Sequence, residues 1–103
     1  MPAFAGFGAV AFDWKAGKYG ASFDQPTQSL AFEQALRQCN SPGCEVNPVE
    51  PKGCGALALS DKDPAWGGAD RVTLARAKHD AVADCQAHTK TGTCTVRISG
   101  CNK

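Results

Sequence analysis

The chain has 103 residues, of which 43% are hydrophobic and 20% charged, a composition typical of a folded domain. This length accommodates one hydrophobic core, so we expect a single domain over residues 1–103. Eleven basic residues are interleaved with ten acidic ones, and the formal net charge is +1. Such a chain offers no basic field for nucleic acid or an anionic membrane, and no apolar run reaches the length of a membrane helix.

Six cysteines in so short a chain indicate a disulfide framework and an oxidising compartment. We therefore expect a secreted or periplasmic protein. Ala3-Phe4-Ala5 has the small-x-small pattern found before a signal-peptide cleavage site, which would make Gly6 the first mature residue. Met1-Pro2 is equally compatible with a start codon added before the mature chain.

The two halves of the chain repeat one another. A shift of 47 positions superimposes residues 8–11 on 55–58, Gly-Ala-Val-Ala on Gly-Ala-Leu-Ala, and the aromatic-glycine pair 19–20 on 66–67. We predict two half-repeats, over residues 6–50 and 53–101, whose length differences lie in loops.

In the first half, alternating small and bulky residues through Ala9–Phe12 predict a strand. The segment Asp13–Lys18 predicts a hairpin turn into a second strand that carries Tyr19. Apolar residues then recur at spacings of three and four up to Cys39, which predicts a helix capped by Thr27 or Ser29 and ended by residues 40–43. Residues 45–49 predict a third strand, and its proline places it at a sheet edge.

The second half repeats this order. A strand over residues 56–59 is followed by a turn at 60–65 and a strand carrying Trp66. A helix from Leu74 to Cys85, capped by Asp70 or Thr73, leads to a third strand over 95–99.

These elements predict an α+β fold of two tandem strand–strand–helix–strand units. We expect one antiparallel sheet with both helices on one face. The small residues of the first strands allow another element to approach one side closely, while the bulky residues fill the other packed layer. The small set is Ala9, Ala11, Ala56 and Ala58, and the bulky set is Val10, Phe12, Leu57 and Leu59.

The repeat also suggests a cysteine pairing among the fifteen that six cysteines allow. Joining each helix end to the strand that follows gives Cys39–Cys44 and Cys85–Cys94, and the equivalent Cys54 and Cys101 would then tie the halves together. The alternative is a zinc site. These spacings match no usual set of zinc ligands and His79 lies within a helix away from both pairs, so we expect no metal.

Together, the repeated Gly-Ala-x-Ala, the helix ending Leu36-Arg37-Gln38-Cys39, the Cys44-x-Val46 segment and Gly53-Cys54-Gly55 make the chain resemble the bacterial family known as domain of unknown function 4189. The resemblance covers residues 8–101. It implies an exported bacterial protein and supplies no catalytic motif or cofactor. The chain departs from the pattern at residues 68–70, where an aromatic is expected, and at Pro48 and Pro51, which interrupt the third strand.

Catalytic and cofactor motifs are sparse. Gly6-x-Gly8-x-x-Ala11 resembles a dinucleotide fingerprint, but a strand follows it where a helix is required, so no cofactor is expected. Asp61 and Asp63 lack the remaining oxygen ligands of a calcium loop. Four residues line one helix stripe at four-residue spacing, which fits either a solvated face or an acid–base set: Arg76, Asp80, Asp84 and His88.

Two hypotheses about function follow. The first is a non-enzymatic module that binds another protein outside the cytoplasm, as an inhibitor, an immunity protein or a host-interaction factor, and that is itself a monomer. The second is a small secreted hydrolase that uses Asp80, Asp84 and His88, because catalytic groups gather in space rather than along the chain.

The repeat locates a candidate contact surface. Features present in both halves are most simply structural, but Trp14 corresponds to Asp61 in the second half and has no such explanation. A tryptophan flanked by Asp13, Lys15 and Lys18 has the composition of an interface anchor. The alternative is that Trp14 folds back over its own hairpin.

Overall fold

The computed structural model describes residues 6–103, so the cleavage pattern at residues 3–5 lies outside the described residues. Each half contains two strands, a helix and a third strand, as predicted. The first half has β1 (Phe7–Asp13), β2 (Lys18–Gln25), α1 (Gln28–Cys39) and β3 (Glu45–Val49). The second half has β4 (Cys54–Ser60), β5 (Trp66–Arg71), α2 (Leu74–His88) and β6 (Cys94–Cys101).

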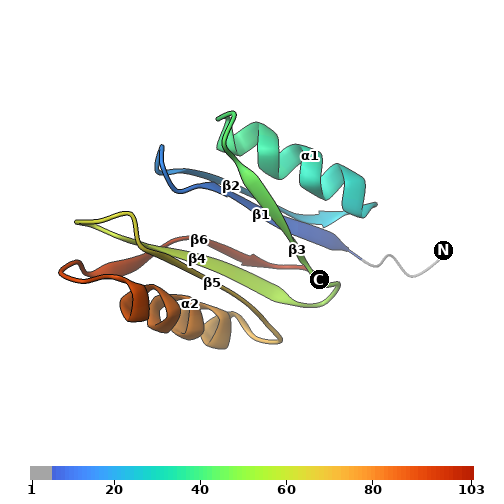
Figure 1. Cartoon of the computed structure of the whole chain (residues 1–103). Coiled ribbons are helices and arrows are strands. Elements are labelled where there is room, and N and C mark those ends of the chain that lie inside the picture. The colour runs from blue at the N-terminus through green and yellow to red at the C-terminus, as the bar shows by residue number, and fades with distance from the viewer. Residues whose placement is uncertain (1–5) are drawn as a thin grey trace.

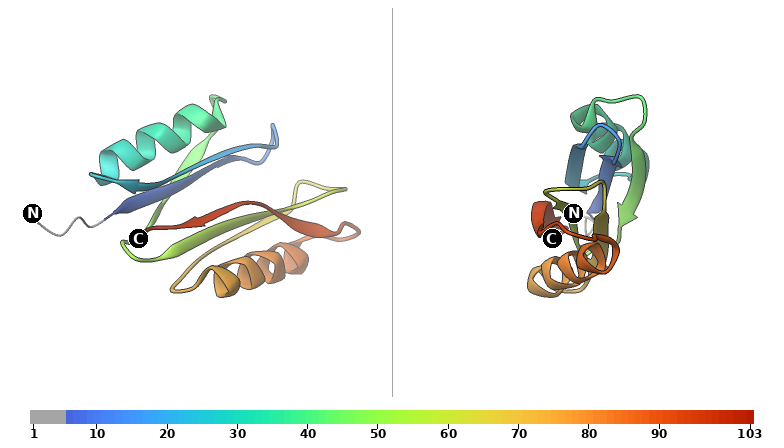
Figure 2. Two further views of the ribbon diagram at one scale, coloured as in Figure 1. Left: turned by 180° about the vertical axis from the view of Figure 1, so that it is seen from behind. Right: turned by 60° about the vertical axis from the view of Figure 1, so that its left-hand side comes forward.

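The strands form two separate antiparallel sheets with equivalent orders, β2-β1-β3 and β5-β4-β6. The first strand of each half is the central one. Figure 1 shows α1 and α2 on opposite outer sides of the molecule with the two sheets between them. The views in Figure 2 show the same order of layers. The α+β class and the repeated unit are confirmed, but the expected single sheet with both helices on one face is replaced by two sheets, each carrying its own helix.

The two faces of the central strands explain this arrangement. Ala9 and Ala11 pack against the buried face of α1, and Ala56 and Ala58 pack against α2. The alternate residues face the other way, and there Phe12 lies with its ring centroid 5.4 Å from that of Trp66, in the other sheet. Since each sheet already has a helix on its small-residue face, its bulky apolar face is buried only by the second sheet.

Each helix lies against the backbone of the second strand of its half at a glycine. A Cβ atom on Gly20 would lie 2.5 Å from the carbonyl oxygen of Ala35, and one on Gly67 would overlap the backbone of Ala81 and Cys85. Both glycines have negative φ, so the requirement is for space rather than for a special backbone conformation. The repeated aromatic-glycine pairs therefore mark the same helix contact twice.

Side chains cap the helices and the outer strand edges in both halves. Thr27 and Thr73 are the N-caps, and each accepts a hydrogen bond from the backbone N–H three residues on. In the first half, Gln38 of α1 accepts a hydrogen bond from the N–H of Ala21 at 3.1 Å. Asp84 of α2 does the same for Gly68 at 3.3 Å. These bonds occupy donors that a free sheet edge would otherwise expose.

The third strands keep their predicted places. β3 spans the predicted residues and lies at an edge of its sheet. Pro48 is tolerated there because proline has no backbone N–H to donate, and an edge strand has a neighbour on one side only. It ends before Pro51. β6 is longer than the predicted 95–99, and β5 continues through residues 68–70 although no aromatic residue is present there.

The three disulfides are the pairs that the repeat predicts, Cys39–Cys44, Cys85–Cys94 and Cys54–Cys101. The first two join a helix end to the strand that follows. The third does not tie the halves together as expected, because Cys54 and Cys101 lie opposite each other on β4 and β6 of the same sheet. It closes the second half on itself.

Asn102 provides a tie between the halves. Its buried side chain donates to the carbonyl oxygens of Val49 and Glu50 at 3.0 and 2.9 Å, and accepts from the N–H of Asp24 at 2.9 Å. Its own N–H donates to the carbonyl of Gly53. The end of the second half is thereby fixed to the first half and to the link between them.

Within residues 6–103, neither helix is long and apolar enough to cross a membrane.

Replacing Gly67 with alanine should lower the free energy of unfolding by about 3 kcal/mol, because the added methyl group meets helix backbone that has no flexible side chain to move. Gly68→Ala is the matched control, since its Cβ would have no non-neighbouring atom closer than 3.7 Å. Urea unfolding followed by circular dichroism compares the two. Equal losses would show that α2 does not approach the strand closely.

Replacing Asn102 with alanine should lower the free energy of unfolding by about 3 kcal/mol, because three buried or half-buried backbone groups lose their partner. Lys103→Ala is the control, since only the backbone N–H of Lys103 bonds to Asp24. Urea unfolding of both variants measures this loss. A free energy of unfolding that is the same for Asn102→Ala and wild type would show that Asn102 does not hold the halves together.

Candidate functional site

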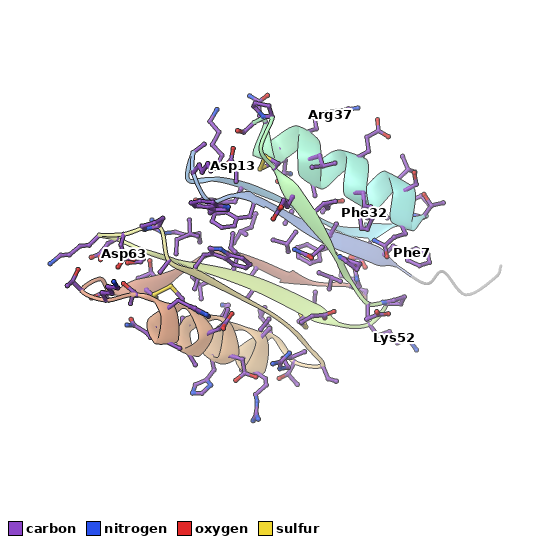
Figure 3. All side chains as sticks on the ribbon, viewed as in Figure 1. Phe7, Asp13, Phe32, Arg37, Lys52 and Asp63 are labelled. Atoms are coloured by element: carbon purple, nitrogen blue, oxygen red, sulfur yellow. A yellow bond between two sulfur atoms is a disulfide. The ribbon has the colours of Figure 1, made fainter. Side chains whose placement is uncertain are left out.

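An open groove of about 640 Å³ lies between the two halves. We call this part of the molecule the hairpin end. The hairpin end consists of the β1–β2 turn, the β4–β5 turn and the loop after α2, residues 89–93. Figure 3 shows Asp13 and Asp63, one from each hairpin, at this end. The groove is lined by Trp14, Asp63, Pro64, Ala65, Trp66, Asp84, His88 and Lys90.

Trp14 is the contribution of the first half to this groove. It is 44% exposed and lines the groove with residues of the second hairpin and of α2. Its side chain therefore borders the groove together with residues of the second half. The ammonium nitrogen of Lys15 lies 5.3 Å from the centre of the indole ring, a cation–π contact.

Trp66 is the second aromatic side chain of the groove. It stacks at a tilt on Phe12, which is buried, and remains 39% exposed. A second hollow of about 340 Å³ between the sheets shares Trp66 and Asp84 with the groove. Sequence reasoning assigned Trp66 a structural role because Tyr19 is its equivalent, and it missed that the same ring reaches the groove. The larger side chain at this position was the available signal.

The other residues predicted beside Trp14 are not equivalent. Asp13 is only 6% exposed, and its carboxylate accepts hydrogen bonds from Ser41 and from the N–H groups of Lys15 and Ala16. The bond from Ser41, followed by that from Ala16, lowers its pKa. Lys18 is exposed and donates to the carbonyl of Asn40 at 3.4 Å, at the end of α1. Asp13 therefore shapes the turn, and only the lysines and the indole reach outward.

Asp63 joins the second hairpin to the loop after α2. It accepts hydrogen bonds from the hydroxyl of Thr89 at 2.8 Å and the N–H groups of Lys90 and Ala65 at 3.0 and 3.2 Å. The bond from Thr89, followed by that from Lys90, lowers the pKa of Asp63 to about 2. Asp61 likewise accepts from the N–H of Thr93 at 2.8 Å. The two aspartates thus bind backbone amides of a neighbouring loop.

The proposed hydrolase residues do not gather at one point. Asp84 and His88 line the groove, with His88 Nδ1 donating to the carbonyl oxygen of Asp84 at 2.8 Å. Asp80 instead accepts from the guanidinium groups of Arg71 and Arg76 at 2.8 and 3.3 Å. The hydrogen bond from His79, followed by that from Arg71, lowers the pKa of Asp80 to about 2. Asp80 is therefore a paired carboxylate.

His79 is exposed on α2. Among residues 6–103, no group of three or more His, Cys, Asp or Glu side chains is placed to hold a metal ion.

The pKa of Asp63 predicts how stability depends on pH. Because the carboxyl group has a lower pKa in the folded chain than its usual 3.8, its ionised form stabilises the fold above about pH 4. This contribution is lost as the pH falls through about 2. Asp63→Asn should therefore be less stable than wild type at neutral pH, with a gap that closes in acid. Thermal unfolding across this range measures the gap, and a gap that is constant down to pH 2 would contradict the assignment.

Comparison with known proteins gives one family and a set of mycobacterial relatives. The family described as "Domain of unknown function (DUF4189)" matches residues 7–101. Protein Rv1269c of Mycobacterium tuberculosis and protein Mb1300c of Mycobacterium bovis are each 36% identical to this chain over 76 residues. The matched region is 74% of this chain and 58% of either relative, so the chain spans a little over half the length of these relatives.

The fold also has a solved counterpart. The NMR structure of Rv1813c from Mycobacterium tuberculosis superposes with a TM-score of 0.71 at 26% sequence identity, over 99% of this chain and 79% of that one. Its likeness therefore extends across both halves of this chain. None of these descriptions names an activity, a ligand or a partner.

Proposed function

Since this chain belongs to the DUF4189 family of domains of unknown function, we propose its role from its own residues: it is a non-enzymatic module that binds a partner protein outside the cytoplasm. The observation that carries the proposal is the groove at the hairpin end, where Trp14 and Trp66 come from different halves and are both partly exposed. Tryptophan is among the residue types that are enriched at the energetic hot spots of protein interfaces.

The location outside the cytoplasm is supported by the disulfides. All six cysteines are paired, and disulfides of this density persist in secreted, periplasmic and cell-surface proteins. Cys39–Cys44 and Cys85–Cys94 also fix the end of each helix to the strand that follows it, which makes each half rigid close to the hairpin end. A preformed surface loses less entropy on binding than a flexible one.

A binding role is favoured over hydrolysis by what the polar groups do. Asp80 is held by two arginines, Asp63 by three donors, and Asp84 accepts the N–H of Gly68. These carboxylates already bond to groups of the protein, whereas the two indole rings are partly exposed in the groove. The module suits an inhibitor, an immunity protein or a host-interaction factor.

Replacing Trp14 with alanine should weaken binding to the partner by roughly 2 kcal/mol, because the indole would be an interface anchor. The free energy of unfolding should change by less than about 0.5 kcal/mol, since the residue is exposed on a turn. Calorimetric titration with a partner purified by affinity capture on the oxidised protein measures the first, and urea unfolding the second. A large loss of stability with unchanged affinity would place the indole in the core and contradict the proposal.

A further inference from the structure

Next to the groove lies the smaller hollow between the two sheets, which we call the inter-sheet hollow. Its volume of about 340 Å³ is within the range of sites that hold small ligands. Its lining comes from β3 and β5, which lie at one edge of each sheet, from the central strands β1 and β4, and from Asp84 of α2. The large apolar side chains that line it belong to both sheets and include Val10, Phe12, Leu57 and Trp66.

The hollow lies where the two halves differ. Phe23 of β2 corresponds to Asp70 of β5 when the halves are superimposed. A Cβ atom added to Gly8, in the first sheet, or to Gly100, in the second, would contact the Phe23 ring, so this ring fills the space between the sheets beside β2. Asp70 is shorter, and Gly68, on the same face of β5, has no side chain. The space between the sheets beside β5 is therefore left open.

Acidic side chains border the hollow, whereas its lining within residues 6–103 contains no Lys, Arg or His. Glu45 is paired with Phe12, and Asp70 with Gly55, so one carboxylate lies near the Phe12–Trp66 stack and the other farther along the hollow. The acidic lining residues are Glu45, Asp70 and Asp84, and the equivalent residues of the other half are all uncharged: Thr95, Phe23 and Gln38. The negative charge is therefore a property of this hollow and not of the repeated unit.

Neither Glu45 nor Asp70 is neutralised by a neighbouring cation. The ion pairs within residues 6–103 include neither of them. Arg71 follows Asp70 in the chain, but its guanidinium donates to Asp80 of α2 at 2.8 Å. These two carboxylates, one from each half, belong to exposed residues and are available to a ligand.

Asp84 is partly engaged by the protein itself. One of its oxygens accepts from the N–H of Gly68 at 3.3 Å, and the other lies 3.7 Å from Nδ1 of His88. The amide donor is neutral and leaves the charge of the carboxylate in place, and His88 offsets that charge only when its imidazole is protonated. Asp84 therefore adds to the negative potential of the hollow, while Glu45 and Asp70 are the groups free to pair.

From the apolar lining and the uncompensated carboxylates, we infer that the inter-sheet hollow binds a small organic cation, an amine with an apolar body. The body packs against Leu57 and Trp66, and the ammonium group donates to Asp70 or Glu45. An anionic ligand would place like charges together, which excludes it. The inference goes beyond the protein-binding proposal, because it needs no partner in the groove.

An NMR titration of the oxidised protein tests the inference with three ligands that share one apolar body: phenethylamine, phenethyl alcohol and hydrocinnamate. Phenethylamine should shift the amide signals of Gly55, Gly68 and Ala69 saturably. It should bind at least about tenfold more tightly than phenethyl alcohol, because only the ammonium group donates a charged hydrogen bond to a carboxylate. Hydrocinnamate should not bind.

Two double variants separate the charge of the hollow from the net charge of the chain. Glu45→Gln combined with Asp70→Asn should lower the affinity for phenethylamine by about tenfold and leave that for phenethyl alcohol unchanged. Glu33→Gln combined with Glu50→Gln is the matched control. It removes the same charge from exposed residues that do not line the hollow, so the affinity should equal that of wild type.

Gly68→Leu tests the position of the ligand. A Cβ atom on Gly68 would have no non-neighbouring atom closer than 3.7 Å, so the leucine side chain should occupy the hollow and abolish binding of phenethylamine and phenethyl alcohol alike. Urea unfolding shows whether the variant keeps its fold.

Equal affinities for phenethylamine and phenethyl alcohol, equal losses in the two double variants, or no saturable shift with phenethylamine would each overturn the inference. Full binding by a folded Gly68→Leu protein would do the same. N-acetyl-lysine amide that binds as tightly as phenethylamine would assign the hollow to a lysine side chain of a partner protein and overturn a small-molecule ligand. None of these variants changes Trp14, so the protein-binding proposal is tested separately by Trp14→Ala.

Discussion

The close approach of each helix to the backbone of its sheet is the constraint on which the other layers depend. Gly20 and Gly67 leave no room for a Cβ atom, and the alanines beside them complete a surface of small residues. Because successive side chains of a strand alternate between faces, the bulky residues must then face away from the helix. A half with one covered face and one bulky apolar face is incomplete by itself. Stacking two sheets buries both bulky faces in a single step.

The two ends of this sheet pair are built differently. At one end, Asn102 joins the backbone of both halves with buried hydrogen bonds. At the hairpin end, contact between the sheets includes the Phe12–Trp66 stack, and the ribbons diverge toward the turns in Figures 1 and 2. Here the aspartates of each hairpin turn accept hydrogen bonds from groups of their own half. An open groove therefore forms at the end that lacks the Asn102 hydrogen bonds. Trp14 and Trp66, which are both partly exposed, line this groove.

The groove is asymmetric because the two halves differ at the positions that form it. The contact between strand and helix is the same at Gly20 and Gly67, and the helices are capped in the same way by Thr27 and Thr73. Trp14 has no equivalent tryptophan, since Asp61 occupies that position and bonds to the neighbouring loop. The two turns thus differ in structure: Trp14 of the first lines the groove, and Asp63 of the second bonds to the loop that carries Lys90.

The sequence by itself determined the repeated unit, the order of its elements and the cysteine pairs, because these follow from local periodicity and from the comparison of one half with the other. It also identified which residues of the central strands are small and which are bulky. Only the tertiary structure decided that the halves form two stacked sheets, that Cys54–Cys101 lies within one sheet, and that Asp13 is buried while Trp66 reaches the groove. These outcomes depend on which surfaces meet across the halves. A strand pattern specifies that a face is apolar, but it does not specify whether a helix or another sheet covers it.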